Sequence, residues 1–203
     1  MKFAKALYYL QHPRNLQFAL AIKYPKLFSD KQFLKILFRN FMGSELNLKC
    51  PQTFSEKLQW LKLYDHNPQY AQMVDKHEAK KYVASIIGEE YIIPTLAVYN
   101  STKEINLDVL PDKFVLKCTH DSGSVAICKD KKTFKTDEAF AMLEKGLQKN
   151  YFWQNREWPY KNVKPRIIAE AYLEDNDTQE LRDYKFFCFN GEVKALFIAG
   201  DRH

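Results

Sequence analysis

Three lysines occupy positions where a positive charge is costly unless it meets an anion or water. Lys117 ends the apolar run at 114–116, and Lys185 leads into the apolar run at 186–189. Lys76 stands at the start of a predicted helix, where the helix dipole mildly disfavours a cation. Because an unpaired buried charge is expensive, we interpret these lysines as candidate contacts to an anionic ligand. Surface lysines that reach solvent are the alternative interpretation.

The short loop that follows Lys117 is rich in small polar residues. It reads THDSGS and contains Thr119, His120, Ser122, Gly123 and Ser124. Hydroxyls and backbone N–H groups next to a glycine can wrap phosphate oxygens. The GKS or GKT ending of a Walker A loop is absent. The loop therefore predicts either a phosphate-binding turn or a plain hairpin connection.

A third candidate region is PRIIAEAYLED, residues 165–175, which reads as a strand ending in acidic residues. The small side chains of Ala169 and Ala171 predict a strand face that is open to a flat ring. Glu170 and the backbone near Tyr172 and Leu173 would then meet the ring edge. The carboxylates of Glu174 or Asp175 would meet ribose hydroxyls. An ordinary strand running into an acidic turn is the alternative.

The elements that must position these residues follow from local signals. Asp75 predicts the N-cap of a helix over 75–88, with Glu78 as the capping-box partner and Gly88 as the stop. The two apolar runs around loop 119–124 predict a hairpin, and a helix is predicted at 136–150. Asn190-Gly191 predicts a second hairpin turn, since a type I′ turn needs positive φ at both central residues. Residues 1–66 read as helical, with Thr53 or Ser55 capping one helix.

Composition narrows the classes of partner. The chain has 203 residues and a formal net charge of +6, which favours an anionic partner. No nucleic-acid recognition signature is present. The four cysteines are scattered and form no CxxC pair, so reduced thiols are expected and a metal site is not. The sequence carries no signal peptide and no run long enough to span a membrane. We expect a cytoplasmic protein, with peripheral contact of residues 1–45 with the inner membrane face left open.

An aromatic and charged segment at 150–162, NYFWQNREWPYKN, has two interpretations. Aromatic faces next to Arg156 suit a sugar or uronate. Packing as a lid or between lobes is the favoured interpretation.

Taken together, the stretches PQTFSEKLQWLKLYD, VDKHEAKKYV, PDKFVLKCTHDSGSV, NREWPYKNVKPRIIAEAYL and DYKFFCFNGEVK resemble the TupA-like family of the ATP-grasp superfamily. The resemblance covers about residue 45 to the C-terminus. It implies an enzyme that clamps ATP between two lobes, converts a carboxylate into an acyl phosphate and lets an amine displace the phosphate. It also implies Mg²⁺ and a role in cell-surface polysaccharide synthesis.

Carried onto this sequence, the resemblance implies that Lys76 and Lys117 bind ATP phosphates, with Lys117 also near the adenine. Residues 119–124 would form the flap, and Glu170 would accept the adenine amino group beside Tyr172 and Leu173. Glu174 or Asp175 would bind the ribose. Lys185 would be a catalytic contact to phosphate or acyl phosphate.

The expected fold is α+β and ATP-grasp-like, with a helical N-terminal region followed by antiparallel-sheet lobes. We expect an N-terminal helical region at 1–66, a nucleotide-binding lobe at 67–175, and the start of an incomplete second lobe at 176–203. The superfamily's Mg²⁺ ligands, an acidic residue and a Glu-x-Asn pair, are not expected in this chain, where Asp201 is the only late acid nearby.

Two alternative functions stay open. One is a glycosyltransferase of the same pathway, for which the weak DND match within 174–180 is the sole metal-motif candidate. The other is a non-catalytic module that binds nucleotide or glycan. The expected partners of the leading hypothesis are ATP, an anionic glycan or its precursor, and an amino-acid-like amine.

Overall fold

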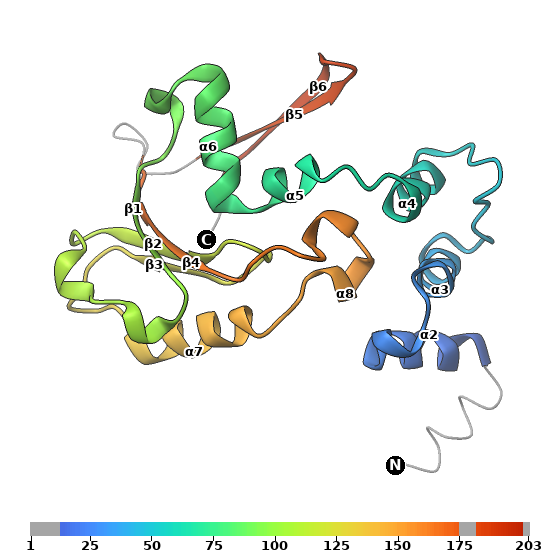
Figure 1. The fold of residues 1–203 in the computed structure, drawn as a ribbon, viewed down its shortest axis with the longest axis horizontal. Coiled ribbons are helices and arrows are strands. Elements are labelled where there is room, and N and C mark those ends of the chain that lie inside the picture. The colour runs from blue at the N-terminus through green and yellow to red at the C-terminus, as the bar shows by residue number, and fades with distance from the viewer. Residues whose placement is uncertain (1–12, 175–181, 201–203) are drawn as a thin grey trace, which may run out of the picture.

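The structure is a computed structural model, and it describes residues 13–174 and 182–200. Helices dominate the N-terminal part, and two antiparallel sheets follow (Figure 1). The protein is therefore α+β, as predicted. The helices and 3₁₀ turns before the first strand are α2 (Pro13–Lys23), η1 (Pro25–Leu27), α3 (Asp30–Met42), α4 (Phe54–Tyr64), α5 (Gln69–Val74), α6 (Lys76–Ile87) and η2 (Glu89–Tyr91).

The N-terminal helices begin and end at the residues that capping chemistry favours. Ser29 caps α3 through a reciprocal capping box with Gln32, and Gly43 ends that helix at a φ of 72°. Thr53, one of the two predicted candidates, caps α4 through a capping box with Glu56. The buried stripe of α3 packs on α2 and on the segment before α4 through Phe33, Leu34, Leu37 and Phe38.

The central sheet has four strands in the order β1-β4-β2-β3, and every neighbouring pair is antiparallel. The strands and the elements between them are β1 (Thr95–Tyr99), η3 (Thr102–Glu104), η4 (Leu107–Val109), β2 (Phe114–Cys118), β3 (Val125–Cys128), α7 (Thr136–Leu147), α8 (Phe152–Asn155), η5 (Trp158–Tyr160) and β4 (Ile167–Ala171). The predicted hairpin around loop 119–124 is thus β2–β3, and its partner β4 occupies the centre of the sheet beside β2.

The two faces of this sheet differ. Leu116 and Ala169 lie directly opposite each other and belong to the main hydrophobic core with Leu143 of α7. Residues of the other parity, such as Lys117 and Glu170, lie on the opposite face. In Figure 1, α7 lies below the sheet and α6 above it. Helix α7 therefore covers one face, and α6 reaches over the other.

The prediction that Ala169 and Ala171 leave one face of β4 open to a flat ring is wrong. Ala169 is fully buried in the core that α7 covers, and Ala171 lies opposite Phe114 of that same core. Ile168 and Glu170 lie on the opposite face of the strand. The alanines are small because a helix packs on them, so their size reflects the core rather than a ring-binding surface.

The last described elements are β5 (Asp183–Phe189) and β6 (Glu192–Ala199), which form a hairpin. Its turn is Asn190-Gly191, with φ values of 51° and 79°, as the sequence predicts. Figure 1 shows this hairpin extending away from the four-stranded sheet. Large apolar side chains on both of its strands are about half exposed, among them Phe186 and Phe197.

Buried Arg156 joins the N-terminal helices to the rest of the chain. Its side chain is fully buried and donates hydrogen bonds to the carbonyls of Pro25 (2.6 Å) and Trp153 (3.1 Å), and it pairs with Asp30 at 2.7 Å. Its guanidinium also lies 4.1 Å from the ring centre of Phe33. The packing interpretation of segment 150–162 therefore holds for Arg156, whose donors face protein rather than a sugar.

Candidate functional site

The sheet face opposite α7 carries a largely buried cluster of three charged side chains, Glu170, Lys80 and Lys117. The carboxylate of Glu170 forms ion pairs with Lys117 at its Oε2 oxygen and with Lys80 at its Oε1 oxygen, the latter at 2.5 Å. Glu170 is 3% exposed, and the side chains of Lys80 and Lys117 are 16% and 21% exposed. Lys117 therefore finds an anion rather than solvent at the end of its strand.

Strand register explains how two of these residues meet. Glu170 lies opposite Val115, and Lys117 lies opposite Ile168, so Lys117 and Glu170 are diagonal neighbours on one face of adjacent strands. Diagonal cross-strand neighbours are within reach of long side chains. The third member, Lys80, comes from α6 above this face. Lys80 is not among the residues predicted from the sequence, although its position four residues after Lys76 places the two lysines on one side of the helix.

Lys76 is held at the base of loop 119–124. Its ammonium donates to the carbonyls of Cys118 (3.0 Å) and Asp121, and its backbone N–H donates to the carbonyl of Thr119 at 3.0 Å. Burial lowers the pKa of Lys76, while the charge of Asp121 opposes that shift. Lys76 and Lys117 are close enough for their charges to repel, which lowers the pKa of Lys76 further.

The loop itself is more enclosed than its polar composition suggests. Thr119, His120 and Ser124 are buried, whereas Ser122 and Gly123 are exposed at the tip. Nε2 of His120 lies 3.1 Å from the carbonyl of Gly146, and the hydroxyl of Ser124 donates to Asp121. The loop is thus anchored at its base, and its tip is the part that faces outward.

Several buried polar atoms around this loop have no hydrogen-bond partner in the described part of the chain. They are Oγ1 of Thr119, Nδ1 of His120, Oδ1 of Asp121 and Nε of Arg166. Buried polar groups are nearly always satisfied in folded proteins. This region therefore contains buried hydrogen-bonding groups that the described residues leave unsatisfied.

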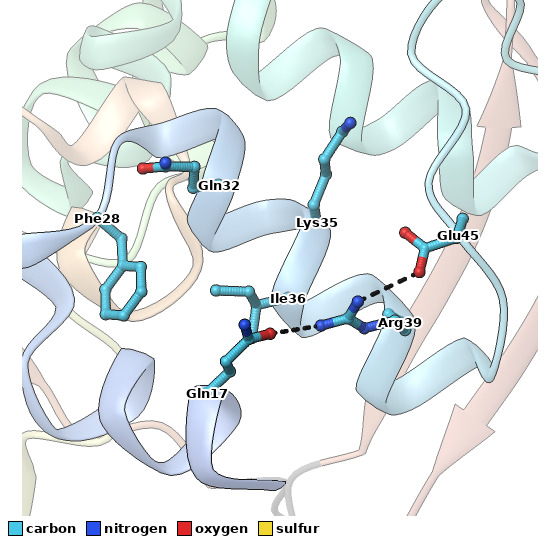
Figure 2. Close-up of a pocket in the computed structure, with 7 residues that line it drawn as sticks. All are labelled: Gln17, Phe28, Gln32, Lys35, Ile36, Arg39 and Glu45. Atoms are coloured by element: carbon cyan, nitrogen blue, oxygen red, sulfur yellow. Dashed lines mark hydrogen bonds and ion pairs between the residues drawn. The ribbon is translucent and has the colours of Figure 1, made fainter. Parts of the chain in front are cut away.

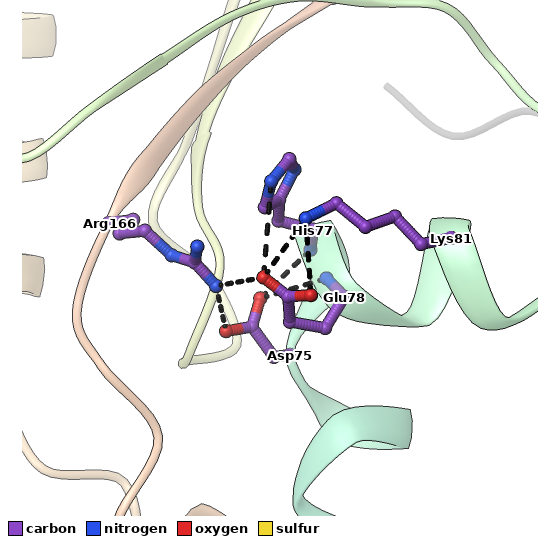
Figure 3. A network of polar contacts seen from close by, with 5 residues as sticks. All are labelled: Asp75, His77, Glu78, Lys81 and Arg166. Atoms are coloured by element: carbon purple, nitrogen blue, oxygen red, sulfur yellow. Dashed lines mark hydrogen bonds and ion pairs between the residues drawn. The ribbon is translucent and has the colours of Figure 1, made fainter.

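A second polar network fixes α6 against the loop and β4 (Figure 3). Asp75 caps α6 by accepting from the backbone N–H of His77, and its other oxygen accepts from Arg166 at 2.7 Å. Arg166 also binds Glu78 at 2.9 Å, and its carbonyl accepts the backbone N–H of Thr119. The expected capping-box bond from Glu78 is replaced by these contacts with Arg166 and Lys81. The network sets the position of Lys76 relative to Lys117.

The remaining predicted residues lie in two other places. Tyr172, Leu173 and Glu174 directly follow β4, where Lys113 pairs with Glu174 at 2.6 Å and lies 5.7 Å from the ring centre of Tyr172. Lys185 lies in β5, is partly exposed and pairs with Asp183 at 3.1 Å. Asp175, Asp201 and most of the 174–180 segment fall outside the described residues.

A pocket in the described part of the chain lies elsewhere, among the N-terminal helices (Figure 2). It measures about 300 Å³, and its lining residues are Gln17, Phe28, Gln32, Lys35, Ile36, Arg39 and Glu45. Arg39 is already bound to Glu45 (3.3 Å) and Gln17 (2.8 Å). No predicted site residue lines this pocket.

The site thus combines three lysines, a buried glutamate and a small-residue loop on one side of an antiparallel sheet. This arrangement, with the α+β fold, is consistent with an ATP-grasp type of protein. A family model described as TupA-like ATPgrasp matches residues 56–203, and the chain belongs to this family. No curated protein and no solved structure matches the chain.

Members of the ATP-grasp superfamily generally use ATP and Mg²⁺. Over residues 13–174 and 182–200, no three His, Cys, Asp or Glu side chains gather as a metal site would require. Among the described helices, none is long and apolar enough to cross a membrane.

Proposed function

We propose that this protein binds ATP on the face of its four-stranded sheet that lies opposite α7 and acts as a carboxylate–amine ligase. The observation that carries the proposal is the Lys117–Glu170 ion pair on that face, with Lys76 beside it at the loop. Lysines here would neutralise the phosphates, and exposed apolar side chains such as Val98 and Ile127 would accept the adenine ring.

The contacts proposed for each residue follow from its place. Lys76 and Lys117 would bind phosphate oxygens, with Lys117 also near the adenine. The tip of the loop, Ser122 and Gly123, would lie over the phosphates. Of the buried loop residues, Thr119 has an unpartnered hydroxyl that fits a phosphate oxygen, whereas His120 and Ser124 would hold the loop in shape.

The adenine and ribose contacts would come from β4 and the segment after it. Glu170 would accept the adenine amino group, and the peptide groups of Tyr172 and Leu173 would meet the ring edge. Glu174 is a ribose candidate if it leaves Lys113, and Asp175 lies outside the described residues. Lys185 would contact phosphate or acyl phosphate once the β5–β6 hairpin approaches the site.

The proposed reaction joins a carboxylate to an amine. A carboxylate oxygen attacks the γ-phosphorus of ATP, ADP leaves, and an acyl phosphate forms. The amine nitrogen then attacks the acyl carbon and releases inorganic phosphate. For a cell-surface glycan, a sugar uronate and an amino acid are the pair to test first. We place this chemistry in the cytoplasm or at the inner face of the membrane.

The first experiment measures ATP binding by calorimetry. Lys117→Ala is expected to weaken ATP binding at least about tenfold, because a charge-assisted contact in a half-buried site is lost. Lys132→Ala removes the same charge from an exposed turn after β3 and is the matched control. Unchanged affinity in Lys117→Ala would remove Lys117 from the site.

The second experiment separates the ligase from its alternatives. Phosphate release that requires ATP, a uronate and an amino acid together would support the ligase. ATP binding without such release would favour a non-catalytic nucleotide-binding module. Release of a nucleoside diphosphate from a nucleotide sugar would favour the glycosyltransferase.

A further inference from the structure

Glu170 is held from both sides, and its second lysine has no role in the function proposed above. Lys117 occupies one carboxylate oxygen, and Lys80 occupies the other at 2.5 Å. A single lysine would suffice to neutralise a buried carboxylate. The second lysine therefore needs an explanation of its own.

Lys80 is itself fixed at a defined place. Its ammonium donates to the carbonyl of Ile93 at 2.6 Å and lies 3.2 Å from Oγ1 of Thr95. Thr95 is the first residue of β1 and pairs with Glu170 across the sheet. Lys80 thus connects α6, the segment before β1 and the central strand β4, and its side chain is 16% exposed.

The two lysines hold the carboxylate of Glu170 in one orientation. An ionised carboxylate has about four lone-pair positions, so each oxygen can accept a further hydrogen bond. The carboxylate cannot donate one while it is ionised. It therefore favours a ligand group that carries N–H and disfavours a carbonyl oxygen at the same point.

We propose that Lys80 is a positioning residue for base recognition, which makes this site selective for a 6-amino purine over a 6-oxo purine. The inference rests on the proposed function, because it assumes that the nucleotide base meets Glu170. Lys80 acts through Glu170: it holds the carboxylate oxygen that Lys117 does not hold. Lys76, one turn earlier on α6, binds the loop carbonyls instead.

The test compares the dissociation constants of ATP and inosine triphosphate, in which a carbonyl replaces the amino group. Lys80→Met keeps the length and the helix propensity of the side chain and removes its charge. We expect ATP to bind at least about tenfold more weakly to Lys80→Met, with inosine triphosphate changed by about twofold or less. The dissociation constant of inosine triphosphate divided by that of ATP then falls toward one.

Lys145→Met is the matched control, because Lys145 is an exposed lysine on another helix, α7, so that the same charge is removed away from the site. It should leave the ratio unchanged. Lys80→Arg restores a cation and should recover part of the selectivity. Thr95→Val removes one partner of Lys80 without changing charge, so it should lower the ratio slightly even if Lys80→Met folds poorly.

Two outcomes overturn the inference by itself. One is an equal loss of affinity for both nucleotides in Lys80→Met and Thr95→Val, which would give Lys80 a structural role alone. The other is an unchanged affinity for both nucleotides in both variants. If the wild-type protein binds neither nucleotide, the proposed function fails and this inference fails with it. If ATP binding to the wild type depends on Lys117 but the ratio is the same in Lys80→Met, the proposed function holds and this inference fails.

Discussion

Gly146 allows α7 to approach the base of the loop, and replacing it with alanine tests how tightly this region is packed. An added Cβ would lie 2.5 Å from Oγ of Ser124, 2.8 Å from Sγ of Cys118 and 2.9 Å from Cβ of Ser124. Ser124 is 5% exposed and Cys118 is fully buried. Neither side chain can swing into solvent to relieve the contact.

Two opposing effects set the magnitude. Overpacking a core costs ~1–3 kcal/mol, and three contacts below 3.0 Å place this case at about 2–3 kcal/mol. Alanine in place of glycine near the end of a helix regains up to about 1 kcal/mol. The expected net loss is about 1–2 kcal/mol. For a chain of this length that corresponds to a fall in Tm of about 2–8 °C.

The assay is thermal and urea denaturation of Gly146→Ala, Ser124→Gly and the double variant. Ser124→Gly removes two of the three short contacts, so the cost of Gly146→Ala should drop by about 1 kcal/mol in that background. Lys145→Ala, a change at the exposed neighbour on α7, should stay within about 0.5 kcal/mol of the wild type. A neutral or stabilising Gly146→Ala, or a coupling near zero, would refute the packing argument.

Three further predictions concern other parts of the molecule. Because burial lowers the pKa of Lys76, its ammonium loses its proton below the ordinary value of 10.5; titrating ATP affinity with pH should show a decline before pH 10.5 that Lys76→Arg shifts upward. Arg156→Met should cost about 2–4 kcal/mol in urea denaturation because buried carbonyls lose their donor, whereas Arg39→Met, at a partly exposed arginine, should cost about 0.5 kcal/mol; similar costs for both would contradict the role of Arg156. Burial raises the pKa of Cys118 to about 12, so maleimide labelling followed by mass spectrometry should find exposed Cys50 and Cys188 modified at least about 100-fold faster than Cys118 and Cys128.

Local signals in the sequence were enough to predict most of the elements. The Asp75 cap and Gly88 stop of α6, the β2–β3 hairpin and the Asn190-Gly191 turn all depend on residues within a few positions of one another. The two faces of β4 could not be assigned in the same way. Ile167, Ile168, Ala169 and Glu170 are all buried, so the strand lacks the alternation that would reveal which face α7 covers.

The site contacts that could not be predicted from the sequence are ion pairs between residues far apart in the chain. Lys80 and Glu170 are far apart in the chain, as are Asp75 and Arg166, and nothing in their neighbourhoods indicates the partner. Lys117 and Glu170 were both predicted as site residues, but their direct pairing follows from the register of β2 and β4. Lys80 had one usable signal, its helical spacing from Lys76, which two lysines on a solvated helix face would also produce.

The concentration of charge at the site favours ligand binding over stability as the reason for this cluster. Lys76, Lys80 and Lys117 lie beside the carboxylates of Glu170, Asp121 and Asp75, so six charged side chains share one largely buried region. Buried ion pairs seldom stabilise a fold more than apolar residues of the same size. An incoming triphosphate would reverse that penalty, because it brings negative charge to lysines that are already held in place and partly stripped of water.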